Sequence, residues 1–329
     1  MQAIVLVGGE GTRLRPLTDA IPKPALTLVD RPILAYLIEW LARHEVSEVV
    51  LACGFKPDVL REALAGEESR AGTKIRYLAE PQPLGTAGAV RFAADSLGDE
   101  LGESFLALNG DVLADLDLGA LLRAHEDRGA AATIGVHPVE DSSAYGLVRC
   151  GEGGEVLEFV EKTGRREPGE INAGMYALER SVLDLIPAGE NVSIERDVFP
   201  RLAERGELRG LRLDGYWTDV GTPQRYLEAS WDVLEGRIET GVRPTAPGIY
   251  LAPDAGLEEG ARIVPRAVVG PRCRIGAGAE VRDSVLLDGS AVGAGARVTG
   301  SILAPGAELA AGAELNGTVA APDARVPIA

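Results

Sequence analysis

The chain has 329 residues, of which 46% are hydrophobic and 25% are charged. This length excludes a single small module, because it allows two domains of ordinary size or one large domain with an appendage. The composition excludes an intrinsically disordered chain, since its apolar residues suffice for a sizeable core. The 50 acidic and 33 basic residues give a formal net charge of −17, which disfavours nucleic acid and anionic lipid as partners. An anionic small substrate would therefore need a few placed cations, or a metal ion, to bind.

The cysteines and the N-terminal segment indicate the cellular compartment. Cys53, Cys150 and Cys273 are far apart and lack CxxC or Cys/His spacing, so we expect buried thiols in a reducing environment. No apolar run reaches the roughly 18 to 20 residues that span a bilayer. The start of the chain has no basic residue before its apolar stretch and no cleavage site after it, so we expect a cytoplasmic protein.

From residue 1 to about residue 235, aliphatic or β-branched runs alternate with segments in which apolar residues have helical spacing. The expected strands are Ala3–Val7, Glu48–Ala52, Lys74–Leu78, Ser104–Leu108 and Ala132–Val136. The expected helices are Ile33–Glu45, Pro57–Leu64, Ala87–Asp95 and Leu118–Arg128. This alternation predicts an α/β fold with a Rossmann-like, doubly wound, mostly parallel sheet. Ligands of such sheets bind outside the carboxyl ends of the strands, so the loops directly after strands are the first candidates for a site.

The pattern changes from about residue 249, where aliphatic residues recur every six positions between Gly and Ala residues. Three segments then superimpose at a period of 17 residues: Cys273–Gly289, Ser290–Gly306 and Ala307–Asp323. The superimposed aliphatic positions are Ile275, Val292 and Leu309; Val281, Val298 and Leu315; and Val285, Ile302 and Val319. Three faces per coil predict a triangular, left-handed parallel β-helix of hexapeptide repeats. A disordered Gly/Ala-rich tail is the alternative, but it has no reason to keep three registers in phase.

These patterns divide the chain into an expected α/β domain at residues 1–236, a linker at 237–248 and a β-helix domain at 249–329. The linker contains Gly and Pro residues that interrupt both periodicities. The open ends of a β-helix can pair with other copies, so we expect a homo-oligomer, either a dimer or a tetramer.

A glycine-rich loop with localised positive charge follows the first expected strand. It reads Gly8-Gly9-Glu10-Gly11-Thr12-Arg13-Leu14-Arg15-Pro16-Leu17-Thr18, and Lys23-Pro24 follows. Glycines let backbone N–H groups approach a ligand closely, and the arginines and lysine supply positive charge, so the loop predicts polyphosphate binding. It is neither a Walker A loop nor the GxGxxG of dinucleotide-binding proteins, because the spacing differs from both.

This loop resembles the signature of the sugar-1-phosphate nucleotidylyltransferases, the NDP-sugar pyrophosphorylases, many of which also carry a C-terminal hexapeptide-repeat domain. Further motifs of that family follow in order: Glu80-Pro81-Gln82-Pro83-Leu84-Gly85-Thr86-Ala87-Gly88, Asn109-Gly110-Asp111, Glu161-Lys162, Asn172-Ala173-Gly174 and Trp217-Thr218-Asp219-Val220-Gly221-Thr222-Pro223. Tyr145-Gly146 lies on the segment that commonly lines the sugar pocket in this family. The resemblance covers nearly the whole chain and is strongest to the mannose-1-phosphate guanylyltransferases. It implies that residues 1–236 form the catalytic domain.

The resemblance also implies roles for individual residues. Arg13, Lys23 and Asp111 are the implied catalytic residues, and Asp111 and Asp219 the implied ligands of Mg²⁺. The implied nucleotide-binding residues are Leu6, Gly8, Gly9, Gly11, Thr12, Arg13, Gln82, Leu84, Gly85, Thr86, Asn109 and Gly110. The implied sugar-phosphate contacts are Gly146, Glu161, Lys162 and Asn172.

Read without the resemblance, several of these residues have simpler interpretations. Asn109-Gly110 would be a turn, Asp219 a helix N-cap, Lys162 a surface lysine and Asn172 a turn residue. Asp111 ends an apolar run, however, which places its carboxylate at the carboxyl edge of the predicted sheet beside the glycine-rich loop.

The implied reaction is the attack of a sugar 1-phosphate oxygen on the α-phosphorus of a nucleoside triphosphate, with release of pyrophosphate. The attacking phosphate is already ionised at neutral pH, so no general base is needed. His44, His125 and His137 are scattered and form no triad or zinc pattern, so we expect structural or solvated roles for them.

GTP and mannose 1-phosphate are the expected substrates. Thymidylyl transfer to glucose 1-phosphate and guanylyl transfer to a heptose or octose 1-phosphate are the alternatives within the family. Outside this activity, an inactive regulatory paralogue is disfavoured because Arg13, Lys23, Asp111 and Asp219 are all present. A hexapeptide-repeat acyltransferase is disfavoured because no histidine follows His137.

Overall fold

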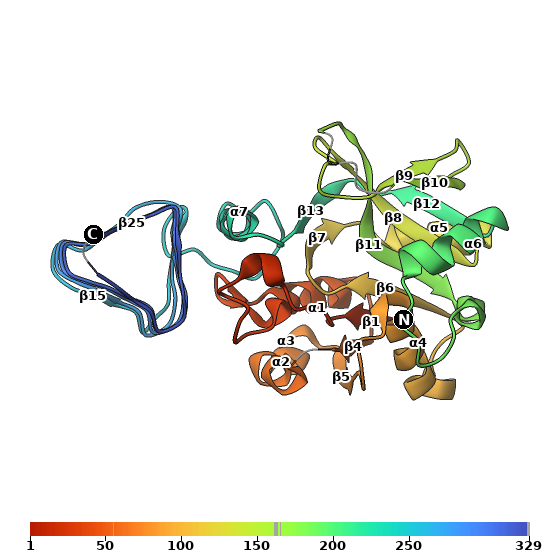
Figure 1. The fold of residues 1–329 in the computed structure, drawn as a ribbon, viewed down its shortest axis with the longest axis horizontal. Coiled ribbons are helices and arrows are strands. Elements are labelled where there is room, and N and C mark those ends of the chain that lie inside the picture. The colour runs from red at the N-terminus through yellow and green to blue at the C-terminus, as the bar shows by residue number, and fades with distance from the viewer. Residues whose placement is uncertain (55, 161–163, 165, 328–329) are drawn as a thin grey trace. The chain divides into compact units, whose positions relative to one another are not determined.

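The computed structural model describes residues 1–54, 56–160, 164 and 166–327 (Figure 1). The chain divides into two compact units. The sheet unit comprises Met1–Gly9 and Leu37–Trp217, and the second unit comprises Glu10–Tyr36 and the chain from Thr218 onward. The expected Glu161 and Lys162 contacts lie outside the described residues.

The centre of the sheet unit is a nine-stranded mixed sheet. Its strands are β1 (Gln2–Leu6), β4 (Glu48–Cys53), β5 (Lys74–Ala79), β6 (Ser104–Asn109), β8 (Ala132–Val139), β9 (Leu147–Cys150), β10 (Val156–Val160), β11 (Gly169–Glu179) and β12 (Leu208–Arg212). Strands β6, β1, β4 and β5 are consecutive parallel neighbours, so their carboxyl ends share one edge of the sheet. Strand β11 runs antiparallel to both β6 and β8, whereas β12 is parallel to β8.

The helices are α1 (Ile33–Arg43), α2 (Pro57–Ala63), α3 (Glu67–Ala71), α4 (Gly85–Leu97), α5 (Leu118–Arg128), α6 (Phe199–Glu204) and α7 (Pro223–Leu234), with a π-helical turn at Ile194–Val198. Helix α4 packs on β1 and β4, and its Val90 shares one buried cluster with Ile4 and Val50 of those strands. This core fixes the position of the parallel strands whose loops carry the predicted site.

The predicted α/β fold with a mostly parallel sheet is confirmed. The predicted helices end within two residues of the observed ones, and the Leu118–Arg128 helix has the predicted bounds. Strand β8 extends three residues beyond the prediction, to Val139. One short strand that periodicity did not indicate, β7 (Val112–Leu116), forms a separate two-stranded sheet with β13 (Gly215–Asp219), whose first three residues belong to the sheet unit.

The C-terminal part of the second unit is a parallel β-helix, whose coils form a triangle in Figure 1. Its strands are β14 (Ile249–Leu251), β15 (Gly256–Leu257), β16 (Arg262–Ile263), β17 (Ala267–Val269), β18 (Arg274–Ile275), β19 (Glu280–Arg282), β20 (Ser284–Leu286), β21 (Ala291–Val292), β22 (Arg297–Thr299), β23 (Ile302–Leu303), β24 (Glu308–Leu309), β25 (Glu314–Asn316), β26 (Val319–Ala320) and β27 (Arg325–Val326). They form three parallel sheets, one for each face of the triangle.

The registers of these sheets confirm the three superimposed positions of the 17-residue repeat. Ile275 pairs with Val292 and Val292 with Leu309, and the other two sets of aliphatic residues pair in the same way. Small residues at the corners allow the coils to stack this closely. A Cβ added at Gly293 would lie 2.4 Å from the backbone nitrogen of Ala311 in the next coil.

A ladder of hydroxyl groups at one corner also connects successive coils. The Oγ atom of Ser284 accepts a hydrogen bond of 3.1 Å from the backbone N–H of Ser301. The Oγ atom of Ser301 in turn accepts one of 3.1 Å from the N–H of Thr318. Ser284 and Ser301 are buried, so these bonds satisfy backbone donors that water does not reach.

The rest of the second unit contains a short hairpin, β2 (Thr27–Leu28) and β3 (Arg31–Pro32), and helix α7. The hydroxyl of Tyr226 on α7 donates a hydrogen bond to the carbonyl of Thr27. Burial raises the pKa of Tyr226, so the hydroxyl keeps its proton and remains a donor. This contact ties the helix that follows Asp219 to the segment that follows the glycine-rich loop.

The described part of the chain contains no helix that is both long enough and apolar enough to span a membrane. Cys53 and Cys273 are buried thiols, as expected, whereas Cys150 is only partly buried, contrary to the expectation. Burial raises the pKa of Cys53 to about 12 and also raises that of Cys273, so both are inert at neutral pH.

A polar network that includes His125 lies between α5 and the sheet. The Nδ1 and Nε2 atoms of His125 lie 2.9 Å from the Thr133 hydroxyl and 3.0 Å from Glu179 Oε1. Ser104 donates a hydrogen bond of 2.7 Å to the same Glu179 oxygen. Burial lowers the pKa of His125 below its ordinary value. The histidine is therefore structural, as the sequence predicts.

This network predicts a pH-dependent stability. Folded His125 stays neutral where the unfolded chain takes up a proton, so stability should fall as the pH drops below the ordinary histidine pKa of about 6.5. Replacing the side chain in His125→Gln should make urea midpoints less pH-dependent between about pH 7.5 and 5.5. The remaining slope of the variant would reflect His44, whose pKa is also lowered by burial. Equal slopes in the two proteins would contradict this prediction.

Candidate functional site

The glycine-rich turn begins at the carboxyl end of β1, against the neighbouring strand. The N–H of Val7 donates a hydrogen bond of 3.0 Å to the carbonyl of Ala52 in β4. A Cβ added at Gly54 would lie 3.0 Å from the Cα of Gly8, so the backbones of these two glycines are in close contact. Glycine at both positions allows this approach.

Asp111 follows β6 directly beside this turn, as predicted. Leu6 and Asn109 are paired at the ends of β1 and β6, and the N–H of Gly110 donates a hydrogen bond of 2.9 Å to the carbonyl of Leu6. A Cβ at Gly110 would lie 2.5 Å from Cγ1 of Val7, which explains the glycine. The turn interpretation of Asn109-Gly110 and the edge position of Asp111 are therefore both correct.

A cluster of cations surrounds Asp219 in the second unit. The Nζ atom of Lys23 lies 2.9 Å from Asp219 Oδ1, and the guanidinium groups of Arg13 and Arg225 each lie 3.6 Å from Oδ2. The side chains of Lys23 and Asp219 are only 6% and 15% exposed. We call these four residues the Asp219 cluster.

Local structure positions each member of the Asp219 cluster. Asp219 is the last residue of β13, and Thr222, rather than Asp219, caps α7 by accepting a hydrogen bond from the N–H of Arg225. Gly11 has a left-handed φ of 63° and accepts a hydrogen bond of 2.9 Å from the Thr18 hydroxyl. A Cβ added at Gly11 would lie 3.0 Å from the Cβ of Lys23, so the turn that carries Arg13 lies close to Lys23.

The Asp219 cluster gathers three basic side chains around one carboxylate. In a chain with a net charge of −17, basic side chains gathered at one place favour an anionic ligand there. The cluster therefore fits the polyphosphate binding that the glycine-rich loop predicts.

The residues expected to hold a metal ion provide oxygen ligands. Asp111 belongs to the sheet unit and Asp219 to the second unit. Within residues 1–54, 56–160, 164 and 166–327, no group of three or more His, Cys, Asp or Glu side chains could hold a metal ion. Mg²⁺ is commonly bound by one or two carboxylates together with substrate phosphates and water, and in this structure both oxygens of Asp219 contact basic side chains of the Asp219 cluster.

The segment expected to bind the nucleotide supports a neighbouring loop. Leu84 is buried, and its carbonyl accepts a hydrogen bond of 2.9 Å from the N–H of Val192. Thr86 Oγ1 accepts one of 2.8 Å from the N–H of Ile194, and a Cβ at Gly85 would lie 2.6 Å from the carbonyl oxygen of Val192. Gln82 Nε2 donates a hydrogen bond of 3.0 Å to the carbonyl of Gly189. These contacts give the segment a structural role whether or not it also contacts a nucleotide.

Asn172 belongs to a network that the sequence does not reveal. Its Nδ2 donates hydrogen bonds of 2.9 Å to the Tyr176 hydroxyl and 2.7 Å to Glu195 Oε1. Its Oδ1 accepts one of 2.8 Å from the N–H of Gly174. Burial, with the nearby carboxylates of Glu195 and Asp111, raises the pKa of Tyr176. Asn172 therefore lies in the same region of the sheet unit as Asp111.

Aromatic contacts lie close to Gly146 in the chain. Tyr145 packs edge-on against Trp217, with ring centroids 5.4 Å apart. The indole Nε1 of Trp217 donates a hydrogen bond of 2.9 Å to the carbonyl of Ala173, next to Asn172. The Tyr145-Gly146 and Asn172-Gly174 motifs are therefore joined through Trp217.

Three charged residues at these places were not predicted as site residues. Arg225 lies in the first turn of α7, where a lone arginine resembles a solvent-facing residue. Glu195 lies in the π-helical turn, which has no helical periodicity in the sequence and which occurs frequently at functional sites. Glu80 follows β5 as Asp111 follows β6, and this shared position after an apolar strand is the signal that could have indicated it.

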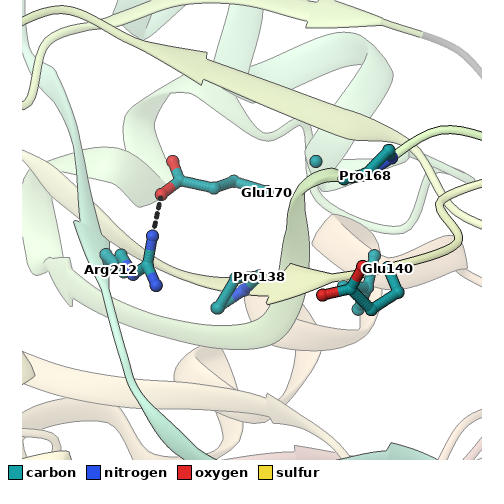
Figure 2. Close-up of a pocket in the computed structure, with 7 residues that line it drawn as sticks. Pro138, Glu140, Pro168, Glu170 and Arg212 are labelled. Atoms are coloured by element: carbon teal, nitrogen blue, oxygen red, sulfur yellow. Dashed lines mark ion pairs between the residues drawn. The ribbon is translucent and has the colours of Figure 1, made fainter.

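A pocket of about 450 Å³ lies elsewhere in the sheet unit, where β8, β11 and β12 meet (Figure 2). Its lining residues are Pro138, Val139, Glu140, Pro168, Gly169, Glu170 and Arg212. The side chains of Glu170 and Arg212 point toward each other and form an ion pair of 3.6 Å. None of the predicted site residues that the structure describes lines this pocket, although Asn172 follows Glu170 by two residues on β11.

Comparisons with known proteins find a matching family for each of the two parts of the chain. The sequence profile of the family described as "Nucleotidyl transferase" matches residues 2–236, and that of "GMPPB C-terminal domain" matches residues 245–327. A probable mannose-1-phosphate guanylyltransferase 3 of Oryza sativa subsp. japonica is 38% identical over 288 residues, which cover 87% of this chain and 80% of the relative. The mannose-1-phosphate guanylyltransferase of Mycobacterium tuberculosis is 38% identical over 295 residues, covering 89% and 81%.

A solved structure is similar as well. The crystal structure of HddC from Yersinia pseudotuberculosis complexed with GMP-PN superimposes with a TM-score of 0.62 and 28% sequence identity. The match covers 70% of this chain and 97% of HddC.

The Asp219 cluster generates a prediction about stability. Asp219→Asn removes the carboxylate that the three cations share, so the free energy of unfolding should fall by about 3 kcal/mol in urea titrations. Asp214→Asn is the matched control, because Asp214 forms an exposed pair with Arg212 at 3.1 Å. The control should change the free energy of unfolding by less than about 0.5 kcal/mol. Similar losses in the two variants would show that the Asp219 cluster has no special energetic role.

Proposed function

Because the chain belongs to the nucleotidyl transferase family, we propose that it transfers the GMP group of GTP to mannose 1-phosphate, which yields GDP-mannose and pyrophosphate. The names of the relatives, in plants, bacteria and animals, support this substrate pair. The convergence of Arg13, Lys23 and Arg225 on Asp219 is the structural observation that carries the proposal, because basic side chains gathered at one place suit a triphosphate and a leaving pyrophosphate.

Under this proposal the chain acts by positioning and charge. An oxygen of mannose 1-phosphate attacks the α-phosphorus of GTP in line, the bond to the bridging oxygen breaks, and pyrophosphate leaves with that electron pair. The attacking oxygen is ionised at neutral pH, so no side chain has to remove a proton. Arg13 and Lys23 hold the phosphates and neutralise part of their negative charge, which would otherwise make the two reactants repel each other.

The backbone of the glycine-rich turn and the two aspartates complete the proposed nucleotide and metal contacts. Gly8, Gly9, Gly11 and Thr12 would present backbone N–H groups to phosphate oxygens. Asp111 and Asp219 would hold Mg²⁺, which when bound supplies positive charge to phosphate oxygens. We retain Mg²⁺ because both proposed ligands are hard oxygen donors.

The sugar-phosphate contacts are proposed from the resemblance and from the Asn172 network. Gly146, Glu161, Lys162 and Asn172 remain the proposed residues. The hydrogen bonds of Asn172 to Tyr176 and Glu195 support a fixed orientation of its side chain. Both amide hydrogens of Asn172 are used in these bonds, so its Oδ1 and the Glu195 carboxylate would accept hydrogen bonds from sugar hydroxyl groups.

We also propose the domain roles and the compartment that the sequence indicates. Residues 1–236 would act as the catalytic domain, 237–248 as a linker and 249–329 as an assembly domain. The buried, inert thiols of Cys53 and Cys273 suit a reducing cytoplasm, where nucleoside triphosphates are available.

The proposed reaction is tested by measuring pyrophosphate release from purified protein and Mg²⁺. GTP and dTTP are each combined with mannose 1-phosphate and glucose 1-phosphate. The pair GTP and mannose 1-phosphate should give the highest kcat/KM, and removal of divalent ions with EDTA should abolish turnover. A higher kcat/KM with dTTP and glucose 1-phosphate would contradict the proposal in favour of thymidylyl transfer.

Variants locate the activity in the same assay. Arg13→Ala and Asp111→Asn should each lower kcat about 100-fold, the effect of losing one charge contact of about 3 kcal/mol in the transition state. Thermal midpoints should stay near that of the wild type, since the Arg13 side chain is 60% exposed. Arg123→Ala, which removes an arginine that is 66% exposed on α5, is the control and should keep wild-type turnover. Near-normal kcat in either site variant would exclude that residue from catalysis.

The first coil of the β-helix supports a proposal about assembly. Leu257 is 42% exposed, whereas Ile275, which occupies the same position one coil later, is 0% exposed. We propose that a second copy of the chain covers this coil in a dimer or tetramer. Light scattering at micromolar concentration should show an oligomer, and Leu257→Glu should shift it toward the monomer. A monomeric wild type would contradict the proposal.

A further inference from the structure

Arg225 is a basic residue of the Asp219 cluster to which the reaction described above gives no separate role. It lies in the first turn of α7, where its backbone N–H donates a hydrogen bond of 3.3 Å to Thr222 Oγ1. Its side chain is 28% exposed, and its Nη1 atom lies 3.6 Å from Asp219 Oδ2. The start of α7 therefore holds this guanidinium beside the carboxylate at the end of β13.

The two oxygens of Asp219 differ in how their partners contact them. Oδ1 lies 2.9 Å from Lys23 Nζ, in a hydrogen-bonded ion pair that is largely shielded from water. Oδ2 lies 3.6 Å from the guanidinium groups of both Arg13 and Arg225, which is beyond hydrogen-bond distance. Oδ1 is thus firmly paired, whereas the longer contacts of Oδ2 can be exchanged at a low cost in free energy.

The backbone next to Asp219 keeps space beside Oδ2. The N–H of Gly221 donates a hydrogen bond of 2.8 Å to the carbonyl of Asp219, so the chain turns tightly between β13 and α7. A Cβ added at Gly221 would lie 2.8 Å from Asp219 Oδ2 and 2.9 Å from Arg13 Nη2. A side chain at this position would therefore fill the space that a further ligand of the carboxylate needs.

The proposed function assigns Asp219 to Mg²⁺, and the contacts of Oδ2 set a condition on that binding. A divalent ion at this oxygen would lie beside two guanidinium groups, whose positive charge opposes it. Nucleotide phosphates reduce this opposition, because a guanidinium group forms shorter, bidentate hydrogen bonds with phosphate oxygens than the 3.6 Å contacts that it makes with Oδ2. Metal binding at Asp219 should therefore depend on the phosphates.

We propose that Arg225 competes with the divalent ion for Asp219 and contacts the phosphates instead when a nucleotide binds. The role deepens the proposed function, on which it rests, by adding a positioning residue that couples metal binding to nucleotide binding. Arg225 suits this role better than Arg13, whose side chain is 60% exposed, because water and salt screen a more shielded charge less. The coupling is reciprocal, so the metal ion raises nucleotide affinity by the factor by which the nucleotide raises metal affinity.

The test measures binding of Mn²⁺, a paramagnetic substitute for Mg²⁺ whose free concentration is read by electron paramagnetic resonance. Without nucleotide, Arg225→Gln should bind Mn²⁺ about 10-fold more tightly than the wild type, a factor typical of coupled sites. Arg225→Met also removes the charge but keeps an apolar stem, and it should show the same gain. Arg225→Lys keeps the charge and should stay within about threefold of the wild type. A merely structural role predicts the opposite sign, because a carboxylate that is less well fixed binds a metal ion less tightly.

The coupling is measured with GTP. Calorimetry gives, for each protein, the ratio of the GTP dissociation constants with EDTA and with saturating Mn²⁺. Binding of Mn²⁺ by GTP in solution is common to all proteins and cancels when their ratios are compared. The ratio should fall about 10-fold in Arg225→Gln, since its metal site no longer needs the phosphates to become accessible.

Arg237→Gln is the matched control. It removes an arginine that is 63% exposed and pairs with Asp232 and Glu235 at the end of α7, so net charge changes equally while the Asp219 cluster stays intact. Its Mn²⁺ affinity should stay within about twofold of the wild type, because salt screens an exposed distant charge. Unchanged or weaker Mn²⁺ binding in Arg225→Gln, or an equal gain in the control, would overturn the inference.

Failure of this role and failure of the proposed function are distinguishable. If the wild type releases no pyrophosphate from GTP and mannose 1-phosphate, the proposed function fails. The Mn²⁺ affinities need no turnover, so they still decide whether Arg225 competes with a divalent ion. A dissociation constant does not depend on the folded fraction of a preparation, so partial unfolding of a variant does not alter the comparison.

Discussion

The ion pair between Lys23 and Asp219 is the interaction on which the candidate site depends most. The two residues are 196 positions apart in the sequence, yet Nζ and Oδ1 lie 2.9 Å from each other and both side chains are largely shielded from water. Such a pair is stable only when its geometry is well fixed. It therefore joins the segment after the glycine-rich loop to the end of β13, and Arg13 and Arg225 are held beside the same carboxylate. Cations fixed in advance need little rearrangement when an anionic ligand binds.

Much of this arrangement could be predicted because the fold obeys short-range rules. Alternation of apolar runs gave the strands, and parallel neighbours β1 and β6 necessarily bring the glycine-rich turn and Asp111 to one edge. The β-helix could be predicted equally well, since its inward residues repeat at a fixed spacing. The handedness of its coils and the domain boundaries remain predictions from the sequence.

The parts that could not be predicted depend on contacts between distant residues or on irregular backbone. The place of Arg225 in the Asp219 cluster depends on its contact with Asp219, which the sequence of helix α7 alone does not predict. Glu195 lies in a π-helical turn, whose spacing no periodic pattern reveals. Residues 84–86 illustrate the opposite case. The resemblance assigned them to the nucleotide, and the structure adds backbone contacts with residues 192–194 that would constrain them in any case.

The hydroxyl ladder at one corner of the β-helix has a consequence for how this part of the chain can vary in length. Ser284, Ser301 and Thr318 recur every 17 residues, and each connects only to the coil before or after it. Loss or gain of one whole coil would restore every pairing, whereas a change by a fraction of a coil would misalign all later rungs. Evolution can therefore lengthen or shorten this region only in steps of one whole turn. Homologous chains should accordingly differ in this region by whole numbers of turns.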